Sequence, residues 1–262
     1  MAKFCSLFSS SSGNCTYIGT SAGGILIDIG VSAKKTEDAL KDIGVDPGEI
    51  RAVFITHEHT DHINGVRVFA ARHRVPVYAT EGTLDGMSYA GVFEKADIKA
   101  YVMPEKGTEV DGIFVRPFRT PHDSLESCGF TVMTPDGKRL AVATDMGTVT
   151  ETVTNALYGC DLVLLESNHD VRMLQNGSYP FYLKKRILSD TGHLNNEKAS
   201  ELAGVLLEGG TSRFILGHLS KENNIPGLAY ETTKAAFSAL GAEENKDYLL
   251  SVALDYNKPV IL

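Results

Sequence analysis

The segment Thr56-His57-Glu58-His59-Thr60-Asp61-His62 contains four candidate metal ligands within six residues. They are His57, His59, Asp61 and His62. Imidazole and carboxylate are suitable ligands for zinc, manganese or iron. Along an extended chain, side chains at i and i+2 point the same way, so His57 and His59 can face one ion. Asp61 and His62 follow where the chain turns towards a predicted helix, which lets them reach a second ion. A solvated polar loop is the alternative, but this density of ligands favours a metal site.

Further ligand candidates follow three predicted strands. His122 comes after a strand at residues 113–118, Asp145 after one at 140–144, and His218 after one at 213–216. Taken singly, each has an ordinary alternative, since a lone His is commonly a surface or core residue and an Asp often caps a helix. Together they indicate one shared site, because loops held by a rigid scaffold combine fixed geometry with access.

The elements that must position these residues alternate between short apolar runs and amphipathic stretches. Early strands follow one another as in hairpins, and later ones alternate with helices, which predicts an α/β fold. We expect an αββα sandwich of two mixed β-sheets flanked by helices, in a single domain of residues 1–262. The other strands are predicted at 3–7, 16–18, 25–28, 52–56, 75–79, 129–133, 162–166 and 248–254, and helices at 34–43, 64–73, 84–91, 148–158, 195–207 and 229–240.

The pattern His57-x-His59-x-Asp61-His62, followed by His122, Asp145 and His218, resembles the metallo-β-lactamase superfamily. The resemblance covers nearly the whole chain. It implies that His57, His59 and His122 hold one metal, that Asp61, His62 and His218 hold the other, and that Asp145 bridges them. Asp28, in Ile27-Asp28-Ile29-Gly30, matches the superfamily's first motif, in which the Asp supports the ligand loop without binding metal.

This chain differs from several branches of the superfamily, which makes the activities of those branches less expected here. Flavodiiron-type members carry Glu where this chain has His59, and true zinc β-lactamases carry Cys in the second site, where this chain has Asp61 and His62. The long insertion of the larger RNA-cleaving β-CASP members and the tRNA-gripping arm of RNase Z-like enzymes are not evident in the sequence.

The overall composition is that of a globular protein, with 43% hydrophobic and 22% charged residues among 262. No apolar run approaches the roughly 18 residues of a membrane span, and the start of the chain has no apolar leader, so we expect a cytoplasmic protein without a membrane partner. The four cysteines form no C-x-x-C pair and are expected to be reduced and mostly buried. A net charge of −8 disfavours a long basic face, so any binding of nucleic acid must be confined to a small part of the surface.

Two segments point to phosphodiesters as substrates. Ser11, Ser12, Gly13 and Asn14 could form an anion cradle, although a serine-rich loop by itself is more often just a turn. In Gly192-His193-Leu194-Asn195-Asn196-Glu197, His193 beside a helix start can hold phosphate or pass a proton, and Asn195 could contact the phosphate. The alternative for Asn195 is a helix-capping turn.

His169 is expected to support His193 or line the pocket. Lys184-Lys185-Arg186, near aromatic residues, is a candidate strand guide.

These segments, with Leu216-Gly217-His218-Leu219-Ser220, resemble the YycJ/WalJ-like branch, which is associated with 5′-to-3′ DNA exonuclease activity. That branch usually has Gly where this chain has Ser10. The resemblance implies a phosphodiesterase acting on nucleic acid, DNA rather than RNA, by two-metal hydrolysis. The two divalent ions would be zinc or manganese, or alternatively iron, and Asp61 and His193 would be catalytic. The alternatives are a thioester or lactone hydrolase on the same core, and a non-catalytic regulatory module. The oligomeric state is not predicted.

Overall fold

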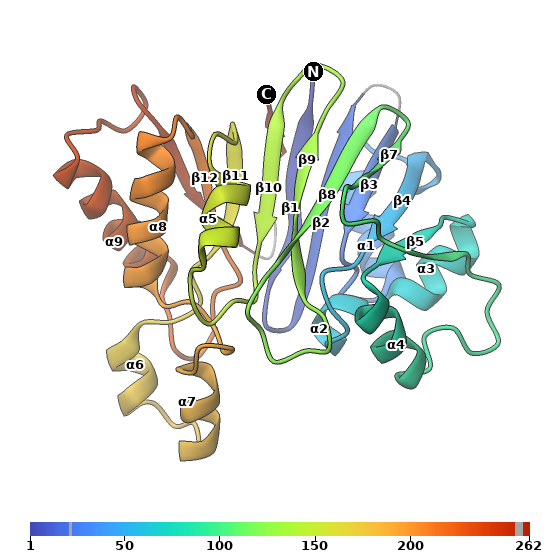
Figure 1. The fold of residues 1–262 in the computed structure, drawn as a ribbon, viewed down its shortest axis with the longest axis horizontal. Coiled ribbons are helices and arrows are strands. Elements are labelled where there is room, and N and C mark those ends of the chain that lie inside the picture. The colour runs from blue at the N-terminus through green and yellow to red at the C-terminus, as the bar shows by residue number, and fades with distance from the viewer. Residues whose placement is uncertain (21–22, 255–258) are drawn as a thin grey trace. The chain divides into compact units, whose positions relative to one another are not determined.

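The structure is a computed structural model that describes residues 1–20, 23–254 and 259–262. The strands belong to two mixed β-sheets with flanking helices (Figure 1). The chain divides into two compact units, and each is considered by itself. Unit 1 is drawn from Met1–Pro117, Ser124–Lys138 and Leu254–Leu262, and unit 2 from Phe118–Asp123 and Arg139–Ala253. The expectation of a single domain stays a prediction.

Unit 1 contains a sheet with the strand order β14-β1-β2-β3-β4-β5-β6. Strands β1, β2 and β3 pair as antiparallel neighbours, whereas β3, β4, β5 and β6 run parallel. The strands are β1 (Lys3–Ser10), β2 (Gly13–Thr20), β3 (Gly23–Ile27), β4 (Ile50–Phe54), β5 (Val77–Ala79), β6 (Ala100–Val102) and β14 (Val260–Ile261). Unit 1 also holds β7 (Thr108–Val110), most of β8 (Ile113–Arg119), and β9 (Cys128–Met133).

The helices of unit 1 bury apolar faces against this sheet. They are α1 (Ala33–Asp42), the 3₁₀ turn η1 (Pro47–Glu49), α2 (Thr60–Ile63), α3 (Val66–His73) and α4 (Glu81–Tyr89). Leu40 of α1, Phe69 of α3 and Met87 of α4 join strand residues in one core and are fully buried. Parallel strands covered in this way read as nearly continuous apolar runs, as β3 does and as β4 does apart from the exposed Arg51.

Unit 2 is built on parallel strands in the order β10-β11-β12-β13. The strands are β10 (Arg139–Ala143), β11 (Leu162–Glu166), β12 (Arg213–Gly217) and β13 (Leu249–Val252), and the helices are α5 (Glu151–Leu157), α6 (Val171–Asn176), α7 (Phe181–Ile187), α8 (Asn196–Glu208) and α9 (Pro226–Ala239). Leu165, Leu206 and Phe237 are among the residues of its separate core. Loops follow the carboxyl ends of neighbouring parallel strands at one edge, which is where α/β sheets place functional residues.

Several elements differ from the prediction. The helix predicted at 64–73 is divided, because α2 ends at Ile63 and α3 begins only at Val66. Helices α6 and α7 were not predicted; both are shorter than two full turns. The four cysteines are free and buried, as predicted. Among the described residues, no helix combines the length and the apolar character needed to cross a bilayer.

Candidate metal centre

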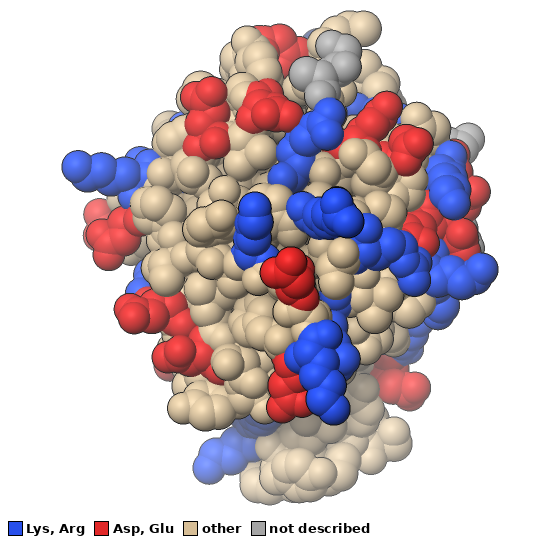
Figure 2. Space-filling model, turned by 90° about the vertical axis from the view of Figure 1, so that its right-hand side faces the viewer, with Lys and Arg blue, Asp and Glu red and all other residues tan. Residues whose placement is uncertain are grey.

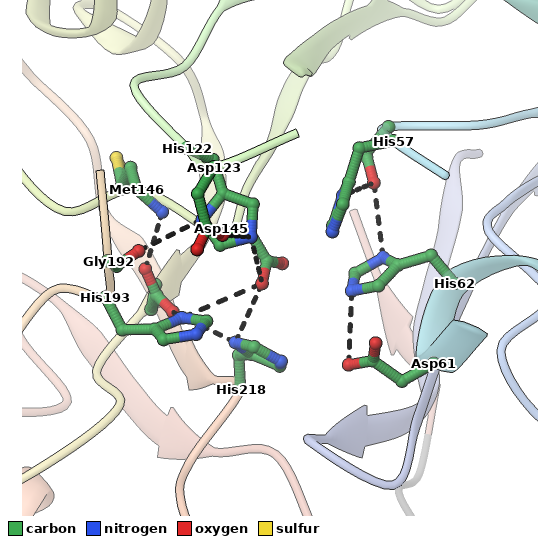
Figure 3. Close-up of polar contacts among 12 residues, drawn as sticks. His57, Asp61, His62, His122, Asp123, Asp145, Met146, Gly192, His193 and His218 are labelled. Carbon is green, nitrogen blue, oxygen red and sulfur yellow. Dashed lines mark hydrogen bonds and ion pairs between the residues drawn. The ribbon is translucent and has the colours of Figure 1, made fainter. Parts of the chain in front are cut away.

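In unit 1, the predicted ligand segment forms a loop that leaves β4 and enters α2. His57 and His62 are buried, and their ring centroids lie 4.1 Å apart (Figure 3). The ring centroids of His57 and His59 lie 4.6 Å apart. Asp61 Oδ2 lies 3.5 Å from His62 Nε2. Within unit 1, the four predicted ligands therefore come from one short segment, with His57 and His59 in the loop and Asp61 and His62 in α2, and two of the imidazoles are buried.

Asp28 holds this loop from the end of β3. Its Oδ1 accepts the backbone N–H of Thr56 at 2.8 Å, and its Oδ2 accepts the Thr56 hydroxyl at 2.9 Å and His62 Nδ1 at 2.8 Å. Asp28 itself is strained, with φ at 62°, and backbone strain of this kind is concentrated at functional sites. Asp28 thus fixes both the backbone and one imidazole, which is the supporting role that the superfamily pattern implies.

The same contacts define the tautomers of two histidines. A carboxylate can only accept, so His62 must carry its proton on Nδ1, and Nε2 keeps a lone pair. The Thr56 hydroxyl donates to Asp28, so it accepts from His57 Nδ1, 3.1 Å away. Neutral His57 then also keeps its lone pair on Nε2. Imidazoles that ligate metals are normally oriented in this way.

The serine-rich stretch is a tight hairpin rather than a loose loop. Ser11 and Ser12 form its exposed turn, while Gly13 and Asn14 are the first residues of β2. Asn14 is buried, and its Nδ2 lies 3.1 Å from His62 Nε2 and 3.5 Å from Asp61 Oδ2. Of the four residues of the predicted anion cradle, Asn14 is therefore the one whose side chain contacts predicted ligands within unit 1.

In unit 2, acidic and imidazole groups meet at the carboxyl ends of adjacent parallel strands. In the strand register Ala143 pairs with Leu165, and Glu166 with Gly217. Asp145, Glu166 and His218 therefore reach one edge. Their ligand atoms, with one from His193, all lie within 4.8 Å of one another. Asp145 and His218 both have positive φ, 59° and 55°, so strained backbone aims these side chains as well.

Glu166 was not predicted from the sequence. Its side chain is fully buried, and Oε1 accepts from His193 Nδ1 at 2.8 Å and from His218 Nδ1 at 2.9 Å. Burial alone would raise the pKa of the Glu166 carboxyl, but these two imidazoles hold it well below its ordinary value. The sequence feature that could have identified Glu166 is its position at the end of an otherwise apolar strand. A carboxylate buried there requires hydrogen-bond donors around it.

His122 is oriented by the loop that carries His193. Its Nδ1 lies 3.0 Å from the Gly192 carbonyl, which can only accept, so the neutral ring keeps its lone pair on Nε2 (Figure 3). His122 Nε2 lies 3.8 Å from Asp145 Oδ1. The His122 and His193 ring centroids lie 5.1 Å apart. Within unit 2, His122, Asp145, His193 and His218 thus gather around Glu166 and the Gly192 carbonyl.

His169 and Asn195 have narrower roles than predicted. His169 is buried, which lowers its pKa to about 4, and neither ring nitrogen has a hydrogen-bond partner among the described residues. Glu166, and not His169, orients His193. Asn195 caps α8 by accepting the backbone N–H of Lys198 at 2.8 Å. The capping alternative for Asn195 therefore describes its observed contact.

Comparisons with known proteins show the family of this chain. The Beta-lactamase superfamily domain matches residues 24–219. Exodeoxyribonuclease WalJ of Streptococcus pneumoniae is 40% identical over 232 residues, which cover 88% of this chain and 86% of WalJ. Exodeoxyribonuclease YycJ of Bacillus anthracis is 35% identical over 235 residues, covering 86% and 85%.

The fold is also found in solved structures. The metallo-β-lactamase fold protein YhfI from Bacillus subtilis aligns with a TM-score of 0.71 over 96% of both chains, at 14% identity. Its fold confirms the predicted class of two mixed sheets flanked by helices. Histidine and aspartate clusters suited to a divalent metal accompany that fold here. The chain therefore belongs to the metallo-β-lactamase superfamily of metal-dependent hydrolases.

Proposed function

We propose that this chain is a dinuclear metal-dependent nuclease that degrades DNA from the 5′ end. The main support is its identity of 40% and 35% to relatives named exodeoxyribonucleases, over most of each chain. The thioester or lactone hydrolase and the non-catalytic module are less favoured, because the relatives are nucleases and no predicted ligand is missing.

We assign the ligands as the superfamily pattern implies. His57, His59 and His122 would hold one divalent ion, Asp61, His62 and His218 the other, and Asp145 would bridge them. The donor chemistry fits, because the Nδ1 contacts of His57, His62, His122 and His218 leave Nε2 as the lone-pair atom of each ring. Zinc or manganese suits this donor set, and iron is compatible with it.

The metals would supply an activated water and stabilise charge on the phosphoryl oxygens. The protein's own contribution centres on His193, whose side chain is 15% exposed. Glu166 accepts the proton of its Nδ1, so Nε2 is the atom that can exchange a proton with substrate. We propose that His193 protonates the leaving oxygen or holds a non-bridging phosphoryl oxygen. Asp61 would contribute as a metal ligand.

A local basic surface in unit 1 supports a polyanionic substrate. Figure 2 shows Lys and Arg side chains gathered on one face of this acidic protein. A hollow of about 540 Å³ is lined by Arg67, Arg72, Arg74 and Lys95, with Asp97 as its acidic residue. Arg72 is paired with Glu37 at 2.7 Å, whereas Arg67, Arg74 and Lys95 have no ion pair among the described residues. Such unpaired cations suit phosphate contacts.

The decisive experiment measures cleavage of 5′- and 3′-labelled DNA and RNA by metal-repleted protein, with a lactone and a thioester run alongside. We expect products released from the 5′ end of DNA and two metals per chain. The His193→Ala variant should be slower by about 10²–10⁴-fold, while His73→Gln, which alters a helix-end residue paired with Glu37, serves as control. Ester turnover without cleavage of nucleic acid would refute the substrate, and clearly less than one metal per chain would refute the dinuclear site.

A further inference from the structure

Two adjacent aromatic side chains project from the first turn of α7. Phe181 is 83% exposed and Tyr182 is 73% exposed. Isolated exposed apolar residues are common, but neighbouring aromatic rings that leave most of their area in water usually mark a contact surface. Figure 1 shows α6 and α7 extending together from unit 2, away from α5, α8 and α9.

A hollow beside Phe181 adds a second observation. It has a volume of about 510 Å³ and is lined by Gln175, Phe181, Lys184, Lys185, Leu188 and Ser189. Its wall combines apolar side chains with lysines and contains no acidic residue. A surface of this composition accepts a ligand with both flat apolar faces and negative charge.

In the basic run Lys184-Lys185-Arg186 on α7, two side chains have partners among the described residues and one does not. Lys184 Nζ donates to the carbonyls of Gln175 at 2.9 Å and Gly177 at 2.7 Å, which ties α6 to α7. Arg186 pairs with Asp123, with Nη2 and Oδ1 2.9 Å apart. Lys185 is exposed and has no ion pair within the described part of the chain. Lys185 is therefore the residue of the run that remains free to meet an anion.

Helix α7 leads directly into the loop that carries His193. The His193 backbone N–H donates to the Ile187 carbonyl at 3.0 Å, and the Gly192 carbonyl contacts His122. Arg186 reaches back to Asp123, beside His122. A ligand held on α7 is thus held by the element that positions His193.

We propose that α6 and α7 form a binding surface for single-stranded DNA, in which Phe181 and Tyr182 stack on bases and Lys185 contacts phosphate. This surface rests on the proposed nuclease function, since it would hold the strand near His193. Bases offer the flat faces and phosphates the charge that the hollow accepts, and stacking on aromatic rings tolerates any base sequence.

The test compares Phe181→Ala/Tyr182→Ala with the parent protein and with Tyr89→Ala, which removes a ring that is 88% exposed on α4 of unit 1. Fluorescence anisotropy would follow binding of a labelled phosphorothioate deoxythymidine strand of about 15 nucleotides, a length within the range of single-strand binding sites. The protein is metal-loaded in each case. A second strand of equal length with abasic sugars keeps the charge and lacks the bases.

We expect the double variant to bind the thymidine strand at least about 10-fold more weakly, because it lacks two aromatic rings on which bases would stack. Parent and double variant should bind the abasic strand equally, and Tyr89→Ala should match the parent on both. Lys185→Gln should make the dependence of affinity on salt less steep. Circular dichroism of each variant reports folding.

Unchanged affinity of the double variant, or an equal loss in Tyr89→Ala, would overturn the surface; a protein or membrane contact would then account for the exposed rings. The binding assay is independent of hydrolysis. Loss of binding in a protein that cleaves no nucleic acid would therefore refute the nuclease function and keep the surface. Cleavage of DNA by the parent protein, with unchanged binding in the double variant, would support the nuclease function and refute the surface.

Discussion

Glu166 is fully buried, and one of its carboxylate oxygens lies 2.8 Å from Nδ1 of the partly exposed His193 and 2.9 Å from His218 Nδ1. The other oxygen, Oε2, accepts backbone N–H groups of Met146 at 2.9 Å and Leu194 at 3.2 Å. One side chain therefore fixes two imidazoles with different assigned roles, a proposed metal ligand and a proposed proton donor.

Replacing the carboxylate by an amide tests this coupling. In Glu166→Gln, the N–H₂ group must face either the two imidazole N–H groups or the backbone N–H groups of Met146 and Leu194, so two donors lose their acceptor in either orientation. We expect hydrolysis of DNA to slow by about 10–100-fold, as for other groups that orient metal-bound histidines. Steady-state kinetics on labelled DNA would measure it, with the fall mainly in kcat. Glu201→Gln, on the exposed face of α8, is the matched control, and equal rates for Glu166→Gln and the parent would contradict the prediction.

Asp28 offers the corresponding test in unit 1. The amide of Asp28→Asn must place a donor against His62 Nδ1, Thr56 N or the Thr56 hydroxyl, where only acceptors fit. We expect metal affinity to fall by about 10–100-fold, measured by competition with a coloured chelator. Asp38→Asn on the exposed side of α1 should leave affinity unchanged. Tight metal binding by Asp28→Asn would mean that the loop is positioned by other contacts.

The predicted ligands of unit 1 are adjacent along the chain, so local geometry limits their positions and the sequence alone places them together. His57, His59, Asp61 and His62 share one segment of six residues, which runs from the loop after β4 into α2. It also predicted Asp145 and His218 at strand ends, since apolar runs locate parallel strands. The unit 2 register then brings Asp145 and His218 to one edge.

Glu166, α6 and α7 were missed for physical reasons. A Glu at the end of a strand is ordinarily solvated, and only the tertiary fold reveals two imidazole donors around it. Helix α7 spans seven residues and has no side-chain cap at Pro180, so it lacks the capping signal that marks a helix start. Asn14 was placed in a phosphate cradle because the sequence does not show that its amide contacts His62.

Gly30 allows the chain after β3 to pass against the ligand loop. A Cβ at this position would lie 1.6 Å from the Asp61 carbonyl oxygen and 2.6 Å from the Asn14 backbone nitrogen. Because backbone atoms must shift, we expect Gly30→Ala to lower the free energy of unfolding by about 3 kcal/mol, the upper range for overpacking. Urea denaturation would measure it. Gly227→Ala, where a Cβ meets nothing within 4 Å at the start of α9, should be neutral or stabilising by up to about 1 kcal/mol. Equal stability of the two variants would contradict the close approach.

The unpaired cations of unit 1 should contribute to substrate binding through charge alone. Arg67 and Lys95 line the same hollow and have no ion pair among the described residues, whereas Lys34 and Lys35 are exposed on α1 outside it. In Arg67→Gln/Lys95→Gln, we expect the slope of log affinity for DNA against log salt concentration to become less steep by about 1–2, since each phosphate contact on a duplex contributes about 0.9. Anisotropy titrations across a series of salt concentrations would measure the affinity and its slope. Lys34→Gln/Lys35→Gln removes the same charge and should leave the slope unchanged. An equal change in both pairs would show that net charge, rather than this hollow, attracts the strand, because a diffuse field acts on all exposed cations alike.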